Sequence, residues 1–190
     1  MPQKTYAKQG LAFLIKKTAR HKLMPIHSPI AGIAIEIGLN IQFTILSLYI
    51  PPHQTFNVTD INNILNQIST PAIIVGDVNA WSNFWGSNNS NSRGQIFEDI
   101  ILASDLVVLN DGSPTHFSTH HTFTHVDITL FSSVLSPKCE WAILDDLHGS
   151  DHYPIITKVF NCTNPSSSKH KPKFKTDAAN WEKYKTIICH

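Results

Sequence analysis

The sequence is poor in cysteine and in net charge. Its three cysteines, Cys139, Cys162 and Cys189, are odd in number, far apart and without a CxxC pair. They therefore argue against a disulfide framework and a zinc or redox motif, and they favour reduced thiols in an intracellular protein. The formal net charge of +1 is too small to indicate nucleic-acid binding from bulk electrostatics. Any contact with phosphate must be local or assisted by a metal ion.

Long apolar runs are also missing. No run approaches the roughly 20 residues that a membrane-spanning helix needs, so no membrane contact is expected. The N-terminal apolar run LAFLI is short, is flanked by lysines and lacks a cleavage pattern, so it does not indicate a signal peptide. At 190 residues and 42% hydrophobic composition, the chain fits one domain and a tail.

The apolar periodicity predicts an α/β domain. Runs 31–37 and 41–50, separated by Gly-Leu-Asn, predict a β-hairpin. A helix is expected over the helically spaced apolar residues 61–68, with Thr59 as its N-cap and Pro71 as its stop. A second helix is expected at 95–104, and further strands at 72–75, 106–110, 115–118, 122–131 and 152–160.

The order of these elements favours sheet-on-sheet packing with helices outside. The loop 81–94 is rich in Asn, Ser and Gly, and its Trp81 and Trp85 either pack against the domain or stack on a base. After Phe160 the composition shifts to Pro, Ser and Lys. We therefore expect one domain over 1–160, a linker at 161–175 and a short helix at 177–188.

Three polar groups interrupt the apolar strands. Asp77 and Asn79 follow the strand in IIVGDVNAW, Asp127 lies within HVDITLF, and Asp151 and His152 belong to HGSDHYPII. An Asp inside an apolar strand is costly to bury without a hydrogen-bond partner, and His152 is the natural candidate for Asp127. A carboxylate behind an imidazole fixes its tautomer and raises its basicity. Asp77 and Asp151 could then share a hard cation such as Mg²⁺.

Each group also has a plain structural explanation. An Asx turn accounts for Asp77 and Asn79, a hydrogen-bonded core carboxylate for Asp127, and an ordinary strand-edge histidine for His152. The occurrence of all three groups in this order favours a functional site over three unrelated structural roles.

The combination resembles the endonuclease/exonuclease/phosphatase family, in particular the apurinic-endonuclease-like domain of non-LTR retrotransposons. The resemblance covers roughly residues 10–160, and the segment after it is similar to the junction that leads toward a reverse transcriptase. The matching segments are LSLYIPP (46–52), IIVGDVNAW (73–81), the WG…SRG loop (85–94), SPTHFS…HVDITL (113–130) and GSDHYPI (149–155).

The resemblance implies a four-layer α/β/β/α sandwich and a metal-dependent phosphodiesterase that nicks DNA to prime reverse transcription. It implies Mg²⁺, or Mn²⁺ in its place, as the cofactor and DNA as the partner. It also implies a reverse transcriptase domain in the parent polyprotein and a site of action in the nucleus.

The same resemblance implies roles at the phosphate. Asp77 would position or deprotonate the attacking water, Asn79 would hold the phosphate, and Tyr49 would contact a phosphate oxygen.

It also implies how charge is balanced. Asp151 would serve the metal site together with Asp77, while His152, oriented by Asp127, would stabilise the charged phosphorane.

One departure from the family is evident. The family begins with an Asn-bearing strand and a strand with the principal metal-ligating Glu, whereas the first carboxylate here is Glu36, whose setting does not match. We therefore expect the opening strands of the sandwich to be absent through N-terminal truncation. This leaves two alternatives open: a catalytically dead remnant that binds nucleic acid or protein, and a small-molecule phosphodiesterase of the same family.

Other polar clusters carry less weight. The spacing of His116, His120, His121 and His125 matches no established zinc pattern, and only alternate residues of a hairpin share a face. No GxSxG elbow accompanies Ser150, so it is not predicted to be a nucleophile. The basic residues at 16–22 and the lysines at 169–175 are expected to be solvated.

Overall fold

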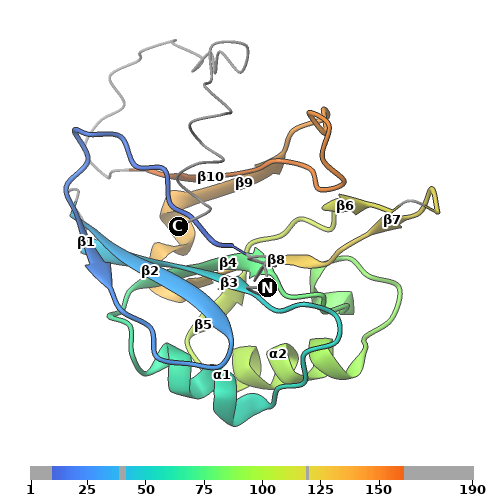
Figure 1. Ribbon diagram of the computed structural model, residues 1–190, viewed down its shortest axis with the longest axis horizontal. Coiled ribbons are helices and arrows are strands. Elements are labelled where there is room, and N and C mark those ends of the chain that lie inside the picture. The colour runs from blue at the N-terminus through green and yellow to red at the C-terminus, as the bar shows by residue number, and fades with distance from the viewer. Residues whose placement is uncertain (1–9, 39–41, 119, 161–190) are drawn as a thin grey trace, which may run out of the picture.

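A six-stranded sheet forms the centre of the computed structural model, which describes residues 10–38, 42–118 and 120–160 (Figure 1). The strand order is β1-β2-β3-β4-β8-β5, and all neighbours are antiparallel except β3 and β4. These strands are β1 (His21–Met24), β2 (Ala31–Gly38), β3 (Gln42–Tyr49), β4 (Ala72–Asp77), β8 (Asp127–Ser132) and β5 (Leu106–Val108).

Different layers cover the two faces of this sheet (Figure 1). Helices α1 (Val58–Leu65) and α2 (Ser92–Ala103) cover one face, and the antiparallel pair β9 (Cys139–Ile143) and β10 (Ile155–Val159) lies over the other. The remaining elements are the short hairpin β6 (His116–Phe117) and β7 (Phe123–Thr124), and the 3₁₀ helices η1 (Asn83–Trp85) and η2 (Ser133–Lys138).

Side-chain alternation along the strands explains this layering. Leu46, Leu48 and Ile50 point to the helices and join a core with residues of α1 and α2. Phe43 points to the opposite face, where it packs in a second cluster with Phe131 and, from β10, Val159. The predicted α/β sandwich is thereby confirmed. Within the described ranges, the β9–β10 sheet has no outer helical layer.

The hairpin is confirmed, and its register runs from Ala31 opposite Tyr49 to Gly38 opposite Gln42. Both helices begin before their predicted starts because asparagines cap them. Asn57, rather than Thr59, caps α1 through a reciprocal capping box with Asp60, with bonds of 2.9 and 3.1 Å. Asn91 caps α2 by accepting from the Gly94 amide at 2.7 Å.

Other predicted boundaries were wrong or incomplete. The run 122–131 is two elements, β7 and β8, because the chain leaves the small hairpin before it enters the large sheet. Strands β1 and β9 were not predicted. The expected linker and helix at 161–188 lie outside the described residues. Among the helices of the described ranges, none has the length and apolar character that crossing a membrane requires.

Gly76 provides a test of the β3–β4 contact. A Cβ at this position would lie 1.9 Å from the carbonyl oxygen of Leu48, a backbone atom that cannot rotate away. Gly76→Ala should therefore separate β3 from β4 and lower the free energy of unfolding by about 3 kcal/mol in urea titrations. The control is Gly38→Ala, where a Cβ meets nothing within 4 Å. Equal stability of the two variants would contradict this account.

Candidate active site

Two carboxylates face each other at the ends of β4 and β8. Asp77 and Asp127 are direct partners in the antiparallel register, so their side chains project from the same face of the sheet. Both are largely shielded from solvent, with side-chain exposures of 22% and 13%. Burial and repulsion by Asp127 raise the pKa of Asp77.

His152 lies between these two acids. Its Nδ1 is 2.8 Å from Oδ2 of Asp127, and its Nε2 is 3.9 Å from Oδ2 of Asp77. The structure thus gives Asp127 the partner that the sequence suggested. The hydrogen bond to Asp127 raises the pKa of His152 against the opposing effect of burial.

The backbone around His152 is held by the small hairpin. Residues His116 and His152 form an isolated antiparallel bridge. On either side of it, the Phe117 amide donates to the Asp151 carbonyl and the Tyr153 amide to the Thr115 carbonyl, both at 2.8 Å. The GSDH segment is therefore fixed against β6.

Asn79 follows Asp77 in a left-handed conformation, with φ of 50°. Its backbone amide and its side-chain Nδ2 both donate to Oδ1 of Asp77, at 3.2 and 2.8 Å, and Nδ2 also donates to the Ile50 carbonyl at 3.3 Å. The Asx turn considered from the sequence is therefore present, and it fixes the carboxylate. Tyr49 is half-buried and stands beside Asp77 in the parallel register of β3 and β4.

Arg93 is a site residue that sequence reasoning missed. Burial lowers its pKa, and its ring-stacked guanidinium lies 5.0 Å from the centroid of Phe56. The SRG segment was the available signal, although nothing in it indicated which groups the arginine would bind. The guanidinium of Arg93 donates, at 2.6–3.3 Å, to the carbonyl oxygens of Ile50, Pro51, Pro52, Gln54 and Val78. The side chain thereby ties the loop after β3 to the turn after β4.

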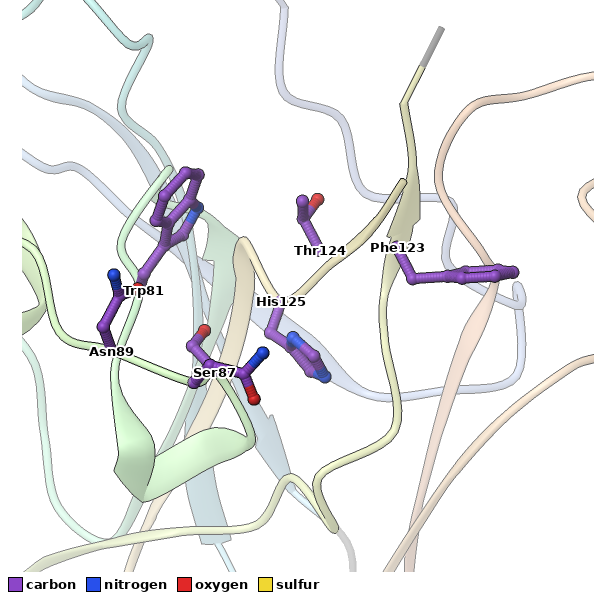
Figure 2. A pocket seen from close by; sticks show the side chains of 7 residues that line it. Trp81, Ser87, Asn89, Phe123, Thr124 and His125 are labelled. Atoms are coloured by element: carbon purple, nitrogen blue, oxygen red, sulfur yellow. The ribbon is translucent and has the colours of Figure 1, made fainter. Parts of the chain in front are cut away.

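A cleft of about 460 Å³ opens over this cluster and is lined by Asn79, Arg93, His116 and His152 together with residues of the hairpin. A smaller pocket of about 160 Å³ adjoins it and shares Trp81 and Thr124. Figure 2 shows Trp81 and Asn89 on one side of this pocket, His125 opposite them and Phe123 turned away.

The two tryptophans of the 81–94 loop have different environments. Trp85 is buried, and its indole nitrogen donates to the carbonyls of Ala80 and His125, at 3.2 and 3.1 Å. Trp81 is 41% exposed at the cleft. Packing therefore explains Trp85, whereas Trp81 remains available to a ligand.

The sequence suggested that Asp77 and Asp151 share a metal ion, but the structure groups Asp151 with two histidines instead. The described residues contain one group that could hold an ion, His116, Asp151 and His152, whose ligand atoms lie within 4.8 Å of one another. Asp77 lies outside this group and approaches it at His152. Glu36 pairs with Thr44, about 16 Å along the strands from the level of Tyr49, so it lies far from the site.

The Asp127–His152 bond predicts a measurable titration. In Asp127→Asn the carboxylate charge is lost, so the pKa of His152 should fall and the imidazole should lose its proton at lower pH. NMR titration of the His152 Cε1 proton measures this change. Asp99→Asn, on the exposed side of α2, is the control and should leave the curve unchanged.

Arg93 predicts a loss of stability. Arg93→Lys keeps the positive charge but replaces the planar guanidinium with an ammonium group, so several backbone carbonyls lose their hydrogen-bond donor. The free energy of unfolding should therefore fall by about 2–4 kcal/mol. Urea denaturation measures the change. Arg20→Lys, at an exposed position, should be neutral, and a neutral Arg93→Lys would contradict the proposed anchoring.

Comparisons with known proteins agree with this geometry. The family model of endonuclease-reverse transcriptases matches residues 43–156. A probable RNA-directed DNA polymerase from transposon X-element of Drosophila melanogaster is 29% identical over 158 residues, covering 79% of this chain and 17% of the relative. The RNA-directed DNA polymerase from mobile element jockey of the same species is 28% identical over 153 residues, covering 77% and 16%. The chain thus spans about one sixth of the length of these relatives.

Among solved structures, the endonuclease domain of TRAS1, a telomere-specific non-LTR retrotransposon, superimposes with a TM-score of 0.62 at 19% identity. The match covers 75% of this chain and 78% of that domain, which establishes the shared endonuclease/exonuclease/phosphatase fold. Because the family model spans more than half of the sequence and the folds agree, this chain belongs to the endonuclease-reverse transcriptase family as a retrotransposon endonuclease-like domain.

Proposed function

We propose that this domain is a metal-dependent phosphodiesterase that nicks DNA for target-primed reverse transcription. The observation that carries the proposal is the chain of contacts Asp127–His152–Asp77, at 2.8 and 3.9 Å, in which His152 lines an open cleft. An acid-oriented imidazole beside a second carboxylate suits attack of water on a phosphodiester without a covalent intermediate.

Asp77 is proposed to accept the proton of the attacking water. Its raised pKa makes it a stronger base than an exposed Asp, and Asn79 fixes Oδ1 while Oδ2 faces Nε2 of His152, which lines the cleft. Asn79 is also proposed to contact a phosphate. To do so, its Nδ2 would give up its longer hydrogen bond, the one of 3.3 Å to the Ile50 carbonyl, and donate to a phosphate oxygen instead. Tyr49, beside Asp77 in the register, is proposed to contact a phosphate oxygen.

His152 is proposed to neutralise charge on the phosphorane. Asp127 favours its protonated form, so the imidazolium can donate from Nε2 toward the phosphate oxygens. The backbone bridge to β6 holds the ring in place and removes the need to reorganise it during the reaction.

The donor set of the site fits a hard divalent ion. Asp77 and Asp127 place two negative charges side by side with only one histidine between them, and Asp151 adds a third carboxylate that is 65% exposed. Mg²⁺ is commonly held by one or two carboxylates and the substrate phosphate. Asp77 and Asp151 would hold it, with Mn²⁺ as the alternative ion, and it would supply charge stabilisation at phosphorus.

The relatives suggest the wider context of the domain. Both Drosophila relatives are RNA-directed DNA polymerases far longer than the aligned segment. We infer that a reverse transcriptase domain belongs to the same parent protein and that the enzyme acts in the nucleus, where the DNA target would be.

A supercoiled-plasmid assay tests the proposal. The chain should convert supercoiled to open-circular DNA with Mg²⁺, whereas Asp77→Ala and His152→Ala should each lower the rate at least about 100-fold. His148→Ala is the matched control, because the exposed His148 side chain pairs with the exposed Asp146 and belongs to none of the proposed roles. A chain that binds DNA without nicking it would support the inactive remnant, and hydrolysis of small phosphodiesters alone would support the small-molecule enzyme.

Metal removal is a separate prediction. EDTA should abolish nicking, and addition of Mg²⁺ or Mn²⁺ in excess should restore it, because among the described residues His152 alone forms ion pairs within 4.0 Å of the paired acids Asp77 and Asp127. The assay is plasmid nicking across a titration of free Mg²⁺. Full activity in EDTA would refute the metal dependence.

A further inference from the structure

His116 has no part in the proposed reaction, yet it forms a compact group with two residues of the GSDH segment. Its Nε2 is 3.7 Å from Oδ2 of Asp151, and its ring centroid is 4.7 Å from that of His152. One ligand atom from each of the three residues lies within 4.8 Å of the others.

Both imidazoles are oriented through their Nδ1 atoms. In His152, Nδ1 bonds Asp127 at 2.8 Å, and in His116, Nδ1 bonds the hydroxyl of Thr124 at 2.7 Å. When Nδ1 carries the proton, the lone pair is on Nε2. Metal-bound histidines typically have this arrangement, in which the second nitrogen donates to a carboxylate or another oxygen.

The backbone fixes the two rings relative to each other. The His116–His152 bridge is flanked by two 2.8 Å amide–carbonyl bonds, and the side chains are only 19% and 32% exposed. Asp151 is 65% exposed and can adjust its rotamer. The group therefore consists of two preoriented nitrogen ligands, which line the cleft, and one exposed, adaptable carboxylate.

We propose that His116, His152 and Asp151 form a binding site for a divalent transition ion of the zinc class, which shares Asp151 with the proposed magnesium ligands and differs from them by its two nitrogen ligands. Imidazole nitrogen suits Zn²⁺ and is a poor ligand for Mg²⁺. Bonds of about 2.0–2.1 Å require neighbouring ligand atoms to be roughly 3.4 Å apart, so the present spacings, which reach up to 4.8 Å, need to close by up to about 1.4 Å. Three protein ligands leave the fourth position open to water.

Occupation of this site has a consequence that rests on the proposed function. The Nε2 atom that would bind zinc is the atom that faces Asp77 and is proposed to donate to the phosphate. One nitrogen cannot do both, so zinc-class ions would compete with phosphodiester hydrolysis at His152.

Cobalt(II) is the probe for the test because its visible absorption reports tetrahedral coordination, with zinc as the competitor. Titrations use the full chain without DNA. His116→Ala should weaken cobalt and zinc binding at this site at least 100-fold. His148→Ala is the matched control: its Nδ1 lies 3.4 Å from Asp146, a similar histidine–aspartate pair without a second imidazole, so binding should be unchanged.

A second variant distinguishes a metal site whose ligands are preoriented by their hydrogen-bond partners from two histidines that are merely close together. Asp127→Asn keeps all three ligands but alters the group behind His152, and it should weaken cobalt binding about 10- to 100-fold. Far-UV circular dichroism establishes that each variant is folded. Binding by folded His116→Ala within twofold of the unchanged chain, or displacement of zinc by millimolar Mg²⁺, would overturn the inference.

The outcome is independent of the nuclease proposal. An active nickase without the cobalt site would refute this inference alone. An inactive chain that retains the site would refute only the proposed function.

Discussion

The pairing of Asp77 with Asp127 across β4 and β8 is the constraint on which the site depends. The antiparallel register places two acids on one face of a sheet whose neighbouring residues are apolar, and such a pair is costly unless positive charge is close. His152 supplies that charge by bonding one acid and facing the other. The proposed metal ion would add the positive charge that this single histidine leaves incomplete.

The rest of the fold keeps this pair in place. Apolar clusters on both faces of the large sheet hold β4 and β8, and Gly76 lets β3 approach β4 directly before Asp77. Arg93 then fixes the loops that follow β3 and β4 by donating to backbone carbonyls alone. Its guanidinium lines the cleft and interacts with the charge of Asp77, so it also contributes a positive field there.

Two kinds of ligand meet in one cleft. Asp77 at the end of β4 and Asp151 in the GSDH segment present carboxylate oxygens, whereas His116 and His152 present nitrogen donors along the edge of the small hairpin. Hard and borderline-soft ions therefore favour different parts of the same surface. Under the proposed function and the inferred zinc-class site, the ion that is bound would determine whether Nε2 of His152 can serve the phosphate.

The sequence by itself determined both helices, most of the strands other than β1 and β9, and the chemical types at the strand ends, which are acids and a histidine. It also predicted a hydrogen-bond partner for Asp127, because an unpaired carboxylate within an apolar strand is costly to bury. It did not determine which side chains meet, because His116 and His152 are far apart in the chain and β-bridge pairing depends on the packed sheet. The same holds for Arg93, whose partners are backbone carbonyls that no residue identity reveals, and for the helix starts, where neighbouring cap-forming residues compete. Only the tertiary structure decided these contacts, since register and loop closure arise from the fold as a whole.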